Sequence, residues 1–488
     1  MISMHFLALS WRRASILVLG SLCYAAAGAE DTHKLTFLPQ TGVVTLGFAD
    51  RSGEVLALAG RDDSGAPRIA FLTADDPGTT IIERALPEDA VAIDAGPNGT
   101  GDALFVLCAD RIERLDTLDG AYTPLANVES LYRGRSFAPL TSSLDIAQDI
   151  DGDDDSEILV QGFDELAVIS GDAYSTVTLL NLPSIRRSFE RAQNYRPVRT
   201  APARIETQAA VVAVRGDDLL RFDLTGTEDT VAAQTQALGL ELSSERDIER
   251  FYNGDPELDQ RDVTLREPEL LSDINGDDLP DLVTLETIST GVFDKQTTYR
   301  IHLARPDLSF DTTPDTVISS KGYQFYIRKV QLEEGRAAIV SPGVRIGVRT
   351  IIGALFSRSV TLDITVHTAD EAGVIAAEPS AEIRAKVRFD FGSGQVEFPT
   401  VEFGDLDGDG RQDLILKRGR DKLGWRRNLG DGRFERRDTG IELRAPKNGS
   451  NVFAADLDGD GNDEIIVRYD MQDGEDLRRT LRVANPGP

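Results

Sequence analysis

Residues 405–413 read Asp-Leu-Asp-Gly-Asp-Gly-Arg-Gln-Asp, and apolar runs stand on both sides of them, at 398–403 and 414–416. The same arrangement of an acidic loop between apolar runs returns at 149–157, 273–281 and 456–464. Short apolar runs bounded by Gly and Asp are typical of β-strands joined by turns. Copies of one loop between strands therefore indicate a repeat fold.

The spacing of the loops predicts how many repeats the chain holds. The last two loops start 51 residues apart, whereas the gaps of 124 and 132 residues before them each fit about two repeats. A weaker copy lies at 94–102, and degenerate strand pairs fill the gaps at 44–58, 205–222 and 326–340. Each unit holds about four short runs, which is typical of a β-propeller blade. We therefore expect an all-β propeller of seven or eight four-stranded blades, and eight fits the spacing better.

The ends of the repeat region predict how the ring closes. The last unit, from 449, runs out after three strands, and the segment 33–38 can supply the missing outer strand. Residues 30–488 then form a single propeller domain. Three stretches fall outside the repeat and are expected to be insertions, near 184–204, 240–262 and 342–358. The first is rich in arginine, and the third contains an apolar and basic stretch, 344–358, that predicts a short helix.

Residues 1–29 have the pattern of a secretory signal peptide. Arg12 and Arg13 precede the apolar run 14–27, and Ala27-Gly-Ala29 forms a small-residue cleavage site. The run is shorter than the ~20 residues that a membrane-spanning helix needs. We expect an exported protein, located in the periplasm, at the cell surface or outside the cell, with no membrane insertion after cleavage. After cleavage Cys108 is the single cysteine that remains, and we expect its thiol to be buried.

The charge of the chain limits its partners. Its 488 residues include 82 acidic and 52 basic side chains, a net charge of −30. Nucleic-acid binding depends on neutralising phosphates with Lys and Arg, so this composition argues against it. It argues equally against docking to an anionic membrane. We expect a monomer that binds a protein or a polysaccharide.

The acidic loops have the chemistry of calcium sites. Ca²⁺ takes six to eight oxygen ligands. We expect carboxylates at positions 1, 3 and 5 to turn inward, position 7 to offer its carbonyl and position 9 to close the site. Gly408 and Gly410 allow the positive φ that the loop needs. The ligands predicted for about four Ca²⁺ sites are Asp149, Asp151, Asp153, Asp155 and Glu157; Asp273, Asn275, Asp277, Leu279 and Asp281; Asp405, Asp407, Asp409, Arg411 and Asp413; Asp456, Asp458, Asp460, Asn462 and Glu464.

The first two of these loops fit calcium less well than the last two. They carry Asp154 and Asp278 at position 6 in place of glycine. Aspartate tolerates the left-handed region better than most residues, which weakens these sites without excluding them. The alternative is a solvated acidic loop without metal. Mg²⁺ is disfavoured because it prefers few protein ligands.

The stretch 403–416 resembles the FG-GAP repeat, also called the VCBS-type repeat, of integrin α-subunit propellers and many secreted bacterial proteins. Residues 428–434 resemble the hairpin that follows this repeat in the bacterial versions. The resemblance implies a propeller with Ca²⁺ in its blade loops. It implies no single activity, because such relatives include adhesion modules, lectins and polysaccharide lyases.

Signals of catalysis are sparse. The sequence has no G-x-S-x-G, H-E-x-x-H or P-loop motif. We predict no catalytic residue and expect a non-catalytic binding, adhesion or scaffold module. Two alternatives stay open: a carbohydrate-active protein, either a lectin or a polysaccharide lyase or hydrolase, that uses the propeller face, and a structural subunit that docks through the helix at 344–358.

Overall fold

The computed structural model describes residues 30–486, with gaps in the description at 75–77, 134–143, 172–173, 190–191, 225–228, 253–262, 292–293, 321, 325, 334–335, 345–347 and 391–394. The predicted signal peptide at 1–29 lies outside the described residues, as do most residues of the 240–262 insertion beyond its helix.

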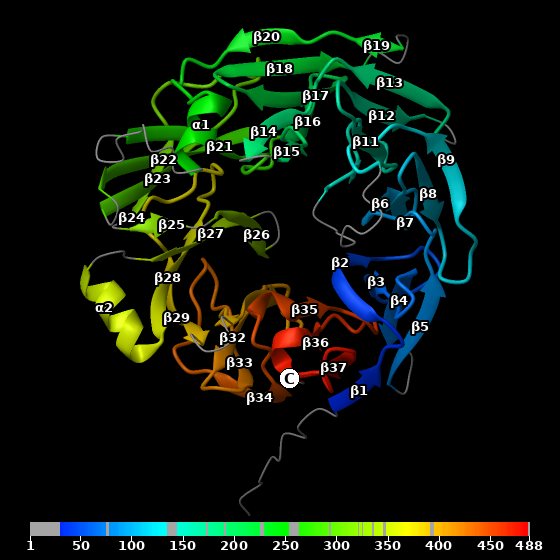
Figure 1. The fold of residues 1–488 in the computed structure, drawn as a ribbon, viewed down its shortest axis with the longest axis vertical. Helices are drawn as coiled ribbons and strands as arrows, with labels where there is room; N and C mark the ends of the chain where they lie inside the picture. Colours follow the sequence, from blue (N-terminus) through cyan, green and yellow to red (C-terminus); the bar gives the residue numbers. More distant parts are fainter. Residues whose placement is uncertain are drawn as a thin grey trace, which may run out of the picture.

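The described residues form nine sheets, eight of which are arranged as a ring around a central axis and pair mainly in antiparallel fashion, while the ninth is a separate two-stranded hairpin (Figure 1). In most of the eight, the first strand lies towards the middle of the ring and the last lies at the rim. This confirms the prediction of an all-β propeller and gives eight blades rather than seven.

The blades follow one another along the chain. Blade 1 comprises β2 (Leu38–Leu46), β3 (Val55–Arg61), β4 (Pro67–Ala74) and β5 (Thr79–Ala85), and blade 2 comprises β6 (Ala92–Asn98), β7 (Gly101–Leu107), β8 (Arg111–Leu115) and β9 (Thr123–Asn127). Blade 3 comprises β10 (Ala147–Gln148), β11 (Glu157–Gln161), β12 (Leu166–Ser170) and β13 (Thr176–Leu180), and β19 (Thr230–Val231) pairs with β13. Blade 4 comprises β16 (Thr200–Ile205), β17 (Gln208–Arg215), β18 (Asp218–Asp223) and β20 (Gln234–Ala237).

The second half repeats the pattern with one larger sheet. Blade 5 comprises β21 (Val263–Ser272), β22 (Asp281–Gly291), β23 (Asp294–His302) and β24 (Thr316–Ser320). Blade 6 comprises β25 (Tyr323–Gln324), β26 (Arg328–Glu333), β27 (Arg336–Val344), β28 (Ser359–Thr368), β29 (Ala381–Asp390) and β30 (Gln395–Glu397). Blade 7 comprises β31 (Val401–Gly404), β32 (Asp413–Arg418), β33 (Lys422–Arg426) and β34 (Thr439–Arg444).

Blade 8 contains strands from both ends of the described chain. It comprises β35 (Val452–Ala455), β36 (Glu464–Arg468), β37 (Thr480–Ala484) and β1 (Glu30–Lys34). Strand β1 pairs with β37 from Glu30 opposite Ala484 to Lys34 opposite Thr480. The closing strand thus starts three residues before the segment 33–38 that the sequence indicated, because the chain continues from Leu38 into β2 of the first blade.

The hydrophobic core lies between neighbouring blades. In one cluster Phe48 and Phe71 of blade 1 pack with Leu104 and Cys108 of blade 2, and comparable clusters join the other blades. Neighbouring blades cover both faces of an inner strand such as β3. Its sequence is therefore continuously apolar and does not alternate between apolar and polar residues. Cys108 is a buried free thiol, as predicted, and burial raises its pKa to about 12.

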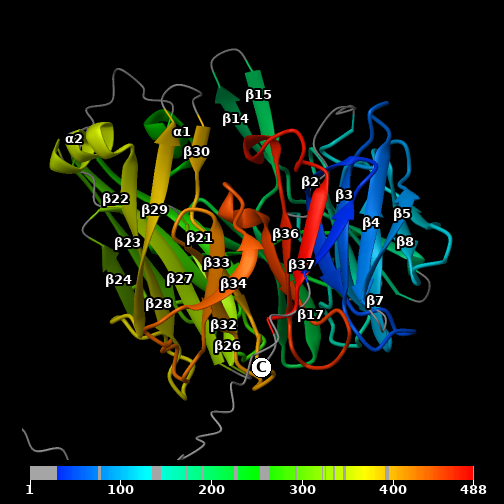
Figure 2. The same ribbon diagram turned by 90° about the horizontal axis from the view of Figure 1, so that it is seen from below.

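The insertions gather on one face of the ring, as Figure 2 shows. The hairpin β14 (Ile185–Phe189) to β15 (Ala192–Arg196) and helix α1 (Glu245–Tyr252) precede the first strands of blades 4 and 5. Helix α2 (Val348–Ser357) joins β27 to β28 in blade 6, within the stretch where the sequence predicted a helix. In an antiparallel blade these connections all lie opposite to the turns that join first and second strands. We call the side with the insertions the insertion face and the opposite side the loop face.

The strand pair predicted at 205–222 is present as β17 and β18, which the turn Arg215–Asp218 joins. These are the second and third strands of blade 4 and not the first and second strands, which flank the acidic loops elsewhere. The turn that corresponds to the acidic loops is instead Glu206–Thr207, between β16 and β17, and Glu206 adopts a φ of 58° there. The first strand of this blade is rich in alanine, and its short apolar pattern does not mark it as a strand by itself.

Candidate metal-binding loops

All four acidic loops join the first strand of a blade to its second strand. They connect β10 to β11, β21 to β22, β31 to β32 and β35 to β36. The last residue of each loop is the first residue of the second strand and is buried, as Asp281 and Asp413 illustrate with 0% exposure. The loops therefore repeat around the loop face, and each is anchored by a buried carboxylate.

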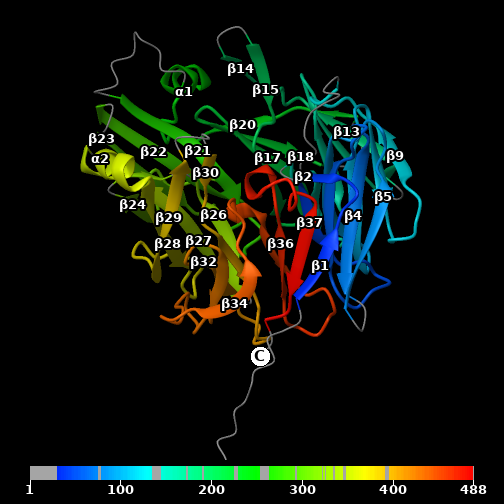
Figure 3. The same ribbon diagram turned by 60° about the horizontal axis from the view of Figure 1, so that its bottom comes forward.

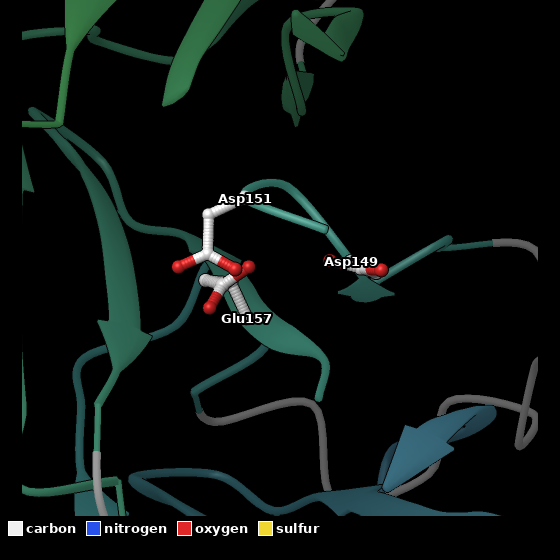
Figure 4. Close-up of side chains that lie close together, drawn as sticks. All are labelled: Asp149, Asp151 and Glu157. Carbon is white, nitrogen blue, oxygen red and sulfur yellow. The ribbon is translucent and has the colours of Figure 1, made fainter. Parts of the chain in front are cut away.

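The loop 149–157 brings three carboxylates together (Figure 4). Ligand atoms of Asp149, Asp151 and Glu157 all lie within 4.8 Å of one another. Glu157 accepts a hydrogen bond from the amide of Ile150 at 2.8 Å, which fixes the end of the loop over its start. The predicted ligand Asp153 is not part of this carboxylate group, and Asp155, which is expected to bind through its carbonyl, stays a prediction.

The loop 405–413 groups Asp405, Asp407 and Asp413 within the same limit. The side chain of Asp407 is only 2% exposed, and neither of its carboxylate oxygens accepts a hydrogen bond. Arg427 forms an ion pair with it from the neighbouring hairpin. The predicted ligand Asp409 lies outside the group and pairs with the Arg411 side chain.

The loop 456–464 groups Asp456, Asp458 and Asp460. Asp456 accepts hydrogen bonds from the amides of Asp460 and Gly461 at 3.1 and 3.0 Å. Glu464 accepts the amide of Leu457 at 3.0 Å but is not part of the carboxylate group. These bonds from amides within the loop hold it in a tight coil, and Gly459 and Gly461 adopt φ values of 75° and 89° in it.

The loop 273–281 has the same backbone bonds but no group of three carboxylates within 4.8 Å among its described residues. Position 3 is Asn275, whose side chain donates to Asp277 at 3.1 Å. The Lys329 ammonium donates to the carbonyl of Asp273. At positions 1, 3, 5 and 9 this loop therefore has three carboxylates, whereas each of the other three loops has four.

The buried carboxylates that end the loops have shifted acidities. Burial, followed by the charges of neighbouring aspartates, raises the pKa of Glu157, Asp413 and Glu464 to about 7, and amide hydrogen bonds oppose the shift. The same causes raise the pKa of Asp281 to about 6. Crowded carboxylates resist joint ionisation unless a cation lies among them. Oxygen-only donors of this kind fit a hard divalent cation.

The weak copy at 94–102 is a hairpin rather than a loop. Strands β6 and β7 pair as far as Asn98 opposite Gly101, which leaves a two-residue turn. Asp94 accepts hydrogen bonds from the amides of Ile146 and Ala147 in the next blade, at 2.7 and 3.0 Å. Burial raises its pKa to about 6. This carboxylate thus joins two blades.

Contacts between blades continue around the loop face. Each loop or turn at this position touches the corresponding segment of a neighbouring blade. The pairs are Gly47 with Asp102, Pro97 with Ser156, Gly152 with Arg204, Arg204 with Asp278, Asp273 with Lys329, Leu332 with Gln412, Asp405 with Asp463, and Asp456 with Glu54. These contacts link the conformation of each loop or turn to that of the loops or turns in the neighbouring blades.

The family comparison concerns the two blades with the clearest loops. Residues 392–467 match the FG-GAP-like repeat family. The chain carries an FG-GAP-like repeat. The match spans β31 to β34 and ends within β36, so it contains the loops 405–413 and 456–464.

Solved structures similar to the chain share little sequence with it. The Dos1 propeller is 8% identical, with 92% of this chain and 95% of that chain covered and a TM-score of 0.39. The α-L-arabinanase of Penicillium chrysogenum, solved with arabinobiose, is 11% identical, with 93% and 99% covered and a TM-score of 0.29. No curated protein matches the chain. These likenesses carry no information on function.

The sequence reasoning missed residues outside the loops that bear on them. Asp463 and Glu54 bind neighbouring loops, and Arg427 contacts Asp407. Asp463 sits at position 8 of its own loop, a position that the ligand pattern leaves free. Nothing in the spacing of these residues gave a signal, because their partners belong to other blades.

Proposed function

We propose that this protein is an exported Ca²⁺-binding β-propeller that acts as a non-catalytic binding or scaffold module. The observation that carries the metal proposal is Asp407. Its carboxylate is almost fully buried, receives no hydrogen bond and lies beside Asp405 and Asp413, and the partly exposed Arg427 side chain forms an ion pair with it. Burying a carboxylate without hydrogen bonds is costly, and a cation bound among the three carboxylates would offset the part of that cost that Arg427 leaves.

The loops would take calcium to different degrees. The loops 149–157, 405–413 and 456–464 each bring three carboxylates together, whereas 273–281 does not. Three strong sites and one weaker site are therefore proposed. When bound, the ion supplies positive charge between carboxylates that repel one another, and the protein supplies the coiled backbone that aims them.

The non-catalytic part of the proposal is supported by the histidines of the described chain. His302 and His367 are buried and each binds a backbone carbonyl through Nδ1 at 2.9 Å. Burial lowers the pKa of both. His33 contacts Thr79 at 2.5 Å between the closing strand and blade 1. These rings hold the fold together and do not face a common site.

Export is supported by the signal-like pattern at 1–29. No helix within the described residues has the length and apolar character needed to cross a membrane. The expected partner is a protein or a polysaccharide that contacts one face of the ring.

The test uses the chain from Glu30 onwards, with calcium and with a chelator, against immobilised acidic and neutral polysaccharides. Retained protein and newly formed chain ends are measured in the same wells. Calcium-dependent retention without new ends supports a binding module. New ends would overturn the non-catalytic proposal in favour of the carbohydrate-active alternative.

A further inference from the structure

A large apolar cavity lies between blades 6 and 7 on the insertion face. Its volume is about 1030 Å³. Its walls are aliphatic and aromatic side chains from β27, β28, β29 and β31, among them Val340, Leu362, Ile364, Val387, Phe389 and Val401. Thr350 and Ala354 of α2 form one side. Helix α2 and the nearby ends of β28 and β29 lie on the insertion face (Figure 3).

The cavity arises from unequal strand lengths. Strands β27, β28 and β29 are 9 or 10 residues long, whereas β31 of the next blade has 4. The part of blade 6 nearest the insertion face therefore extends beyond blade 7. Ile364 is nonetheless only 2% exposed and Val340 only 4%. Packed proteins leave few voids larger than a water molecule, so space of this size with apolar walls is suited to a ligand.

The described lining carries no net charge. The two Nη atoms of Arg328 donate to the two carboxylate oxygens of Glu402 at 2.9 and 3.2 Å. The same guanidinium lies 5.6 Å from the centre of the Phe403 ring. Both charges are thus satisfied within the wall. The other polar groups of the lining, including those of Tyr326 and Ser450, are uncharged.

We propose that this cavity binds an uncharged, mainly hydrocarbon small molecule that carries one hydroxyl or carbonyl group, such as a monoacylglycerol. The hydrocarbon would lie against β27 to β29, and the polar group would meet the hydroxyl and amide groups at the rim. A neutral ligand matches the neutral lining, and the net charge of −30 disfavours an anionic one. The site is independent of the acidic loops, which lie on the other face.

The test uses the chain from Glu30 onwards and Nile red, an uncharged fluorescent probe. We expect saturable binding of one probe per chain, displaced by monolauroylglycerol and not by laurate at the same concentration. Ala354→Trp, which fills the cavity from α2, should weaken binding at least tenfold. Ser357→Trp, on the same helix but exposed and outside the lining, should change it less than twofold.

Two further variants separate the cavity from the surface. Thr350→Trp gives a second blockage if Ala354→Trp does not fold, as judged by its melting curve. Phe356→Ser removes an 87% exposed aromatic side chain that could attract the probe, and binding should survive it. Absence of saturable binding, binding by the folded blocked variants as tight as that by the unaltered chain, loss of binding in Phe356→Ser, or stronger displacement by laurate would each overturn the proposal.

Discussion

Asp463 and Asp405 are joined by two reciprocal hydrogen bonds across the boundary between blades 8 and 7. The amide of Asp463 donates to the carbonyl of Asp405 at 2.6 Å, and the amide of Asp405 donates to the carboxylate of Asp463 at 2.7 Å. Asp405 is the first residue of one acidic loop, and Asp463 is the eighth of the next. The two loops thus share a fixed geometry, and a change in one is transmitted to the other.

This relationship predicts a shared effect of one substitution. Asp463→Asn keeps the size of the side chain but weakens the bond to the Asp405 amide, since bonds to charged acceptors contribute about 1.5–3 kcal/mol. We expect lower thermal stability and weaker calcium binding at both 405–413 and 456–464, measured by calorimetry. Asp50→Asn, at an exposed position, is the matched control. An effect limited to one loop would argue against the coupling.

Removal of one carboxylate from each of two loops tests the metal assignment. The double variant Asp407→Asn with Asp458→Asn should lower calcium stoichiometry by about two. It should also reduce the rise in melting temperature on adding calcium, because a ligand bound only to the native state stabilises it by mass action. Asp119→Asn, an exposed aspartate outside the loops, should change neither quantity. An unchanged stoichiometry would refute the assignment of these loops.

Arg427 is predicted to compete with calcium at Asp407. The Arg427 side chain is 47% exposed, so solvent screens its ion pair with the buried Asp407 carboxylate. Arg427→Gln should therefore tighten calcium binding at this loop by up to about fivefold and slightly lower stability in chelator. Arg437→Gln, exposed after the same hairpin, serves as control. Weaker calcium binding in Arg427→Gln would show that the arginine supports the site instead.

Glu269 predicts a pH dependence separate from the metal loops. It lies at an irregularity between Pro268 and Leu270 of β21, and burial raises its pKa to about 7 although Arg199, 3.9 Å away, opposes the shift. Between about pH 4.5 and 7 the folded protein therefore binds more protons here than the unfolded chain. Stability contributed at this site falls as pH rises through that range, by ~3 kcal/mol at most.

Glu269→Gln should remove this dependence. Urea unfolding at pH 5 and at pH 7.5 should show a smaller fall in stability for the variant than for the unaltered chain. Glu475→Gln, whose side chain is 72% exposed, provides the comparison. Identical pH profiles for the unaltered chain and Glu269→Gln would mean that Glu269 is ionised in the folded protein.

Strand β1 is predicted to close the ring. Removing residues 30–34 leaves β37 as an exposed edge and deletes the ion pair between Glu30 and Arg482 at 2.9 Å. We expect a lower melting temperature and concentration-dependent association, because unpaired edges pair with other chains. Replacing these five residues by threonine should restore most of the stability through the backbone ladder. If the truncated chain were as stable as the full one, closure would not depend on β1.

The metal loops were recognisable in the sequence because their geometry is local. Carboxylates at alternate positions and glycines at 408 and 410 describe one tight coil without reference to the rest of the chain. The full set of five ligands in each loop, one of them a backbone carbonyl, stays a prediction. The structure groups three carboxylates in three of the loops, and in the fourth Asn275 binds Asp277 instead. Side-chain pairing of this kind depends on rotamers that spacing does not specify.

The sequence by itself determined the repeat and the position of the acidic loops, because strand length and turn chemistry depend on neighbouring residues, and it left the number of blades at seven or eight. Only the tertiary structure decided that there are eight blades, which loops touch, as with Asp405 and Asp463, and which residues of β1 and β37 pair to close the ring. It alone placed the apolar cavity between blades 6 and 7, since a void depends on the relative lengths of two sheets. Contacts of this kind arise when the ring closes, and they join residues whose chain separation carries no signal.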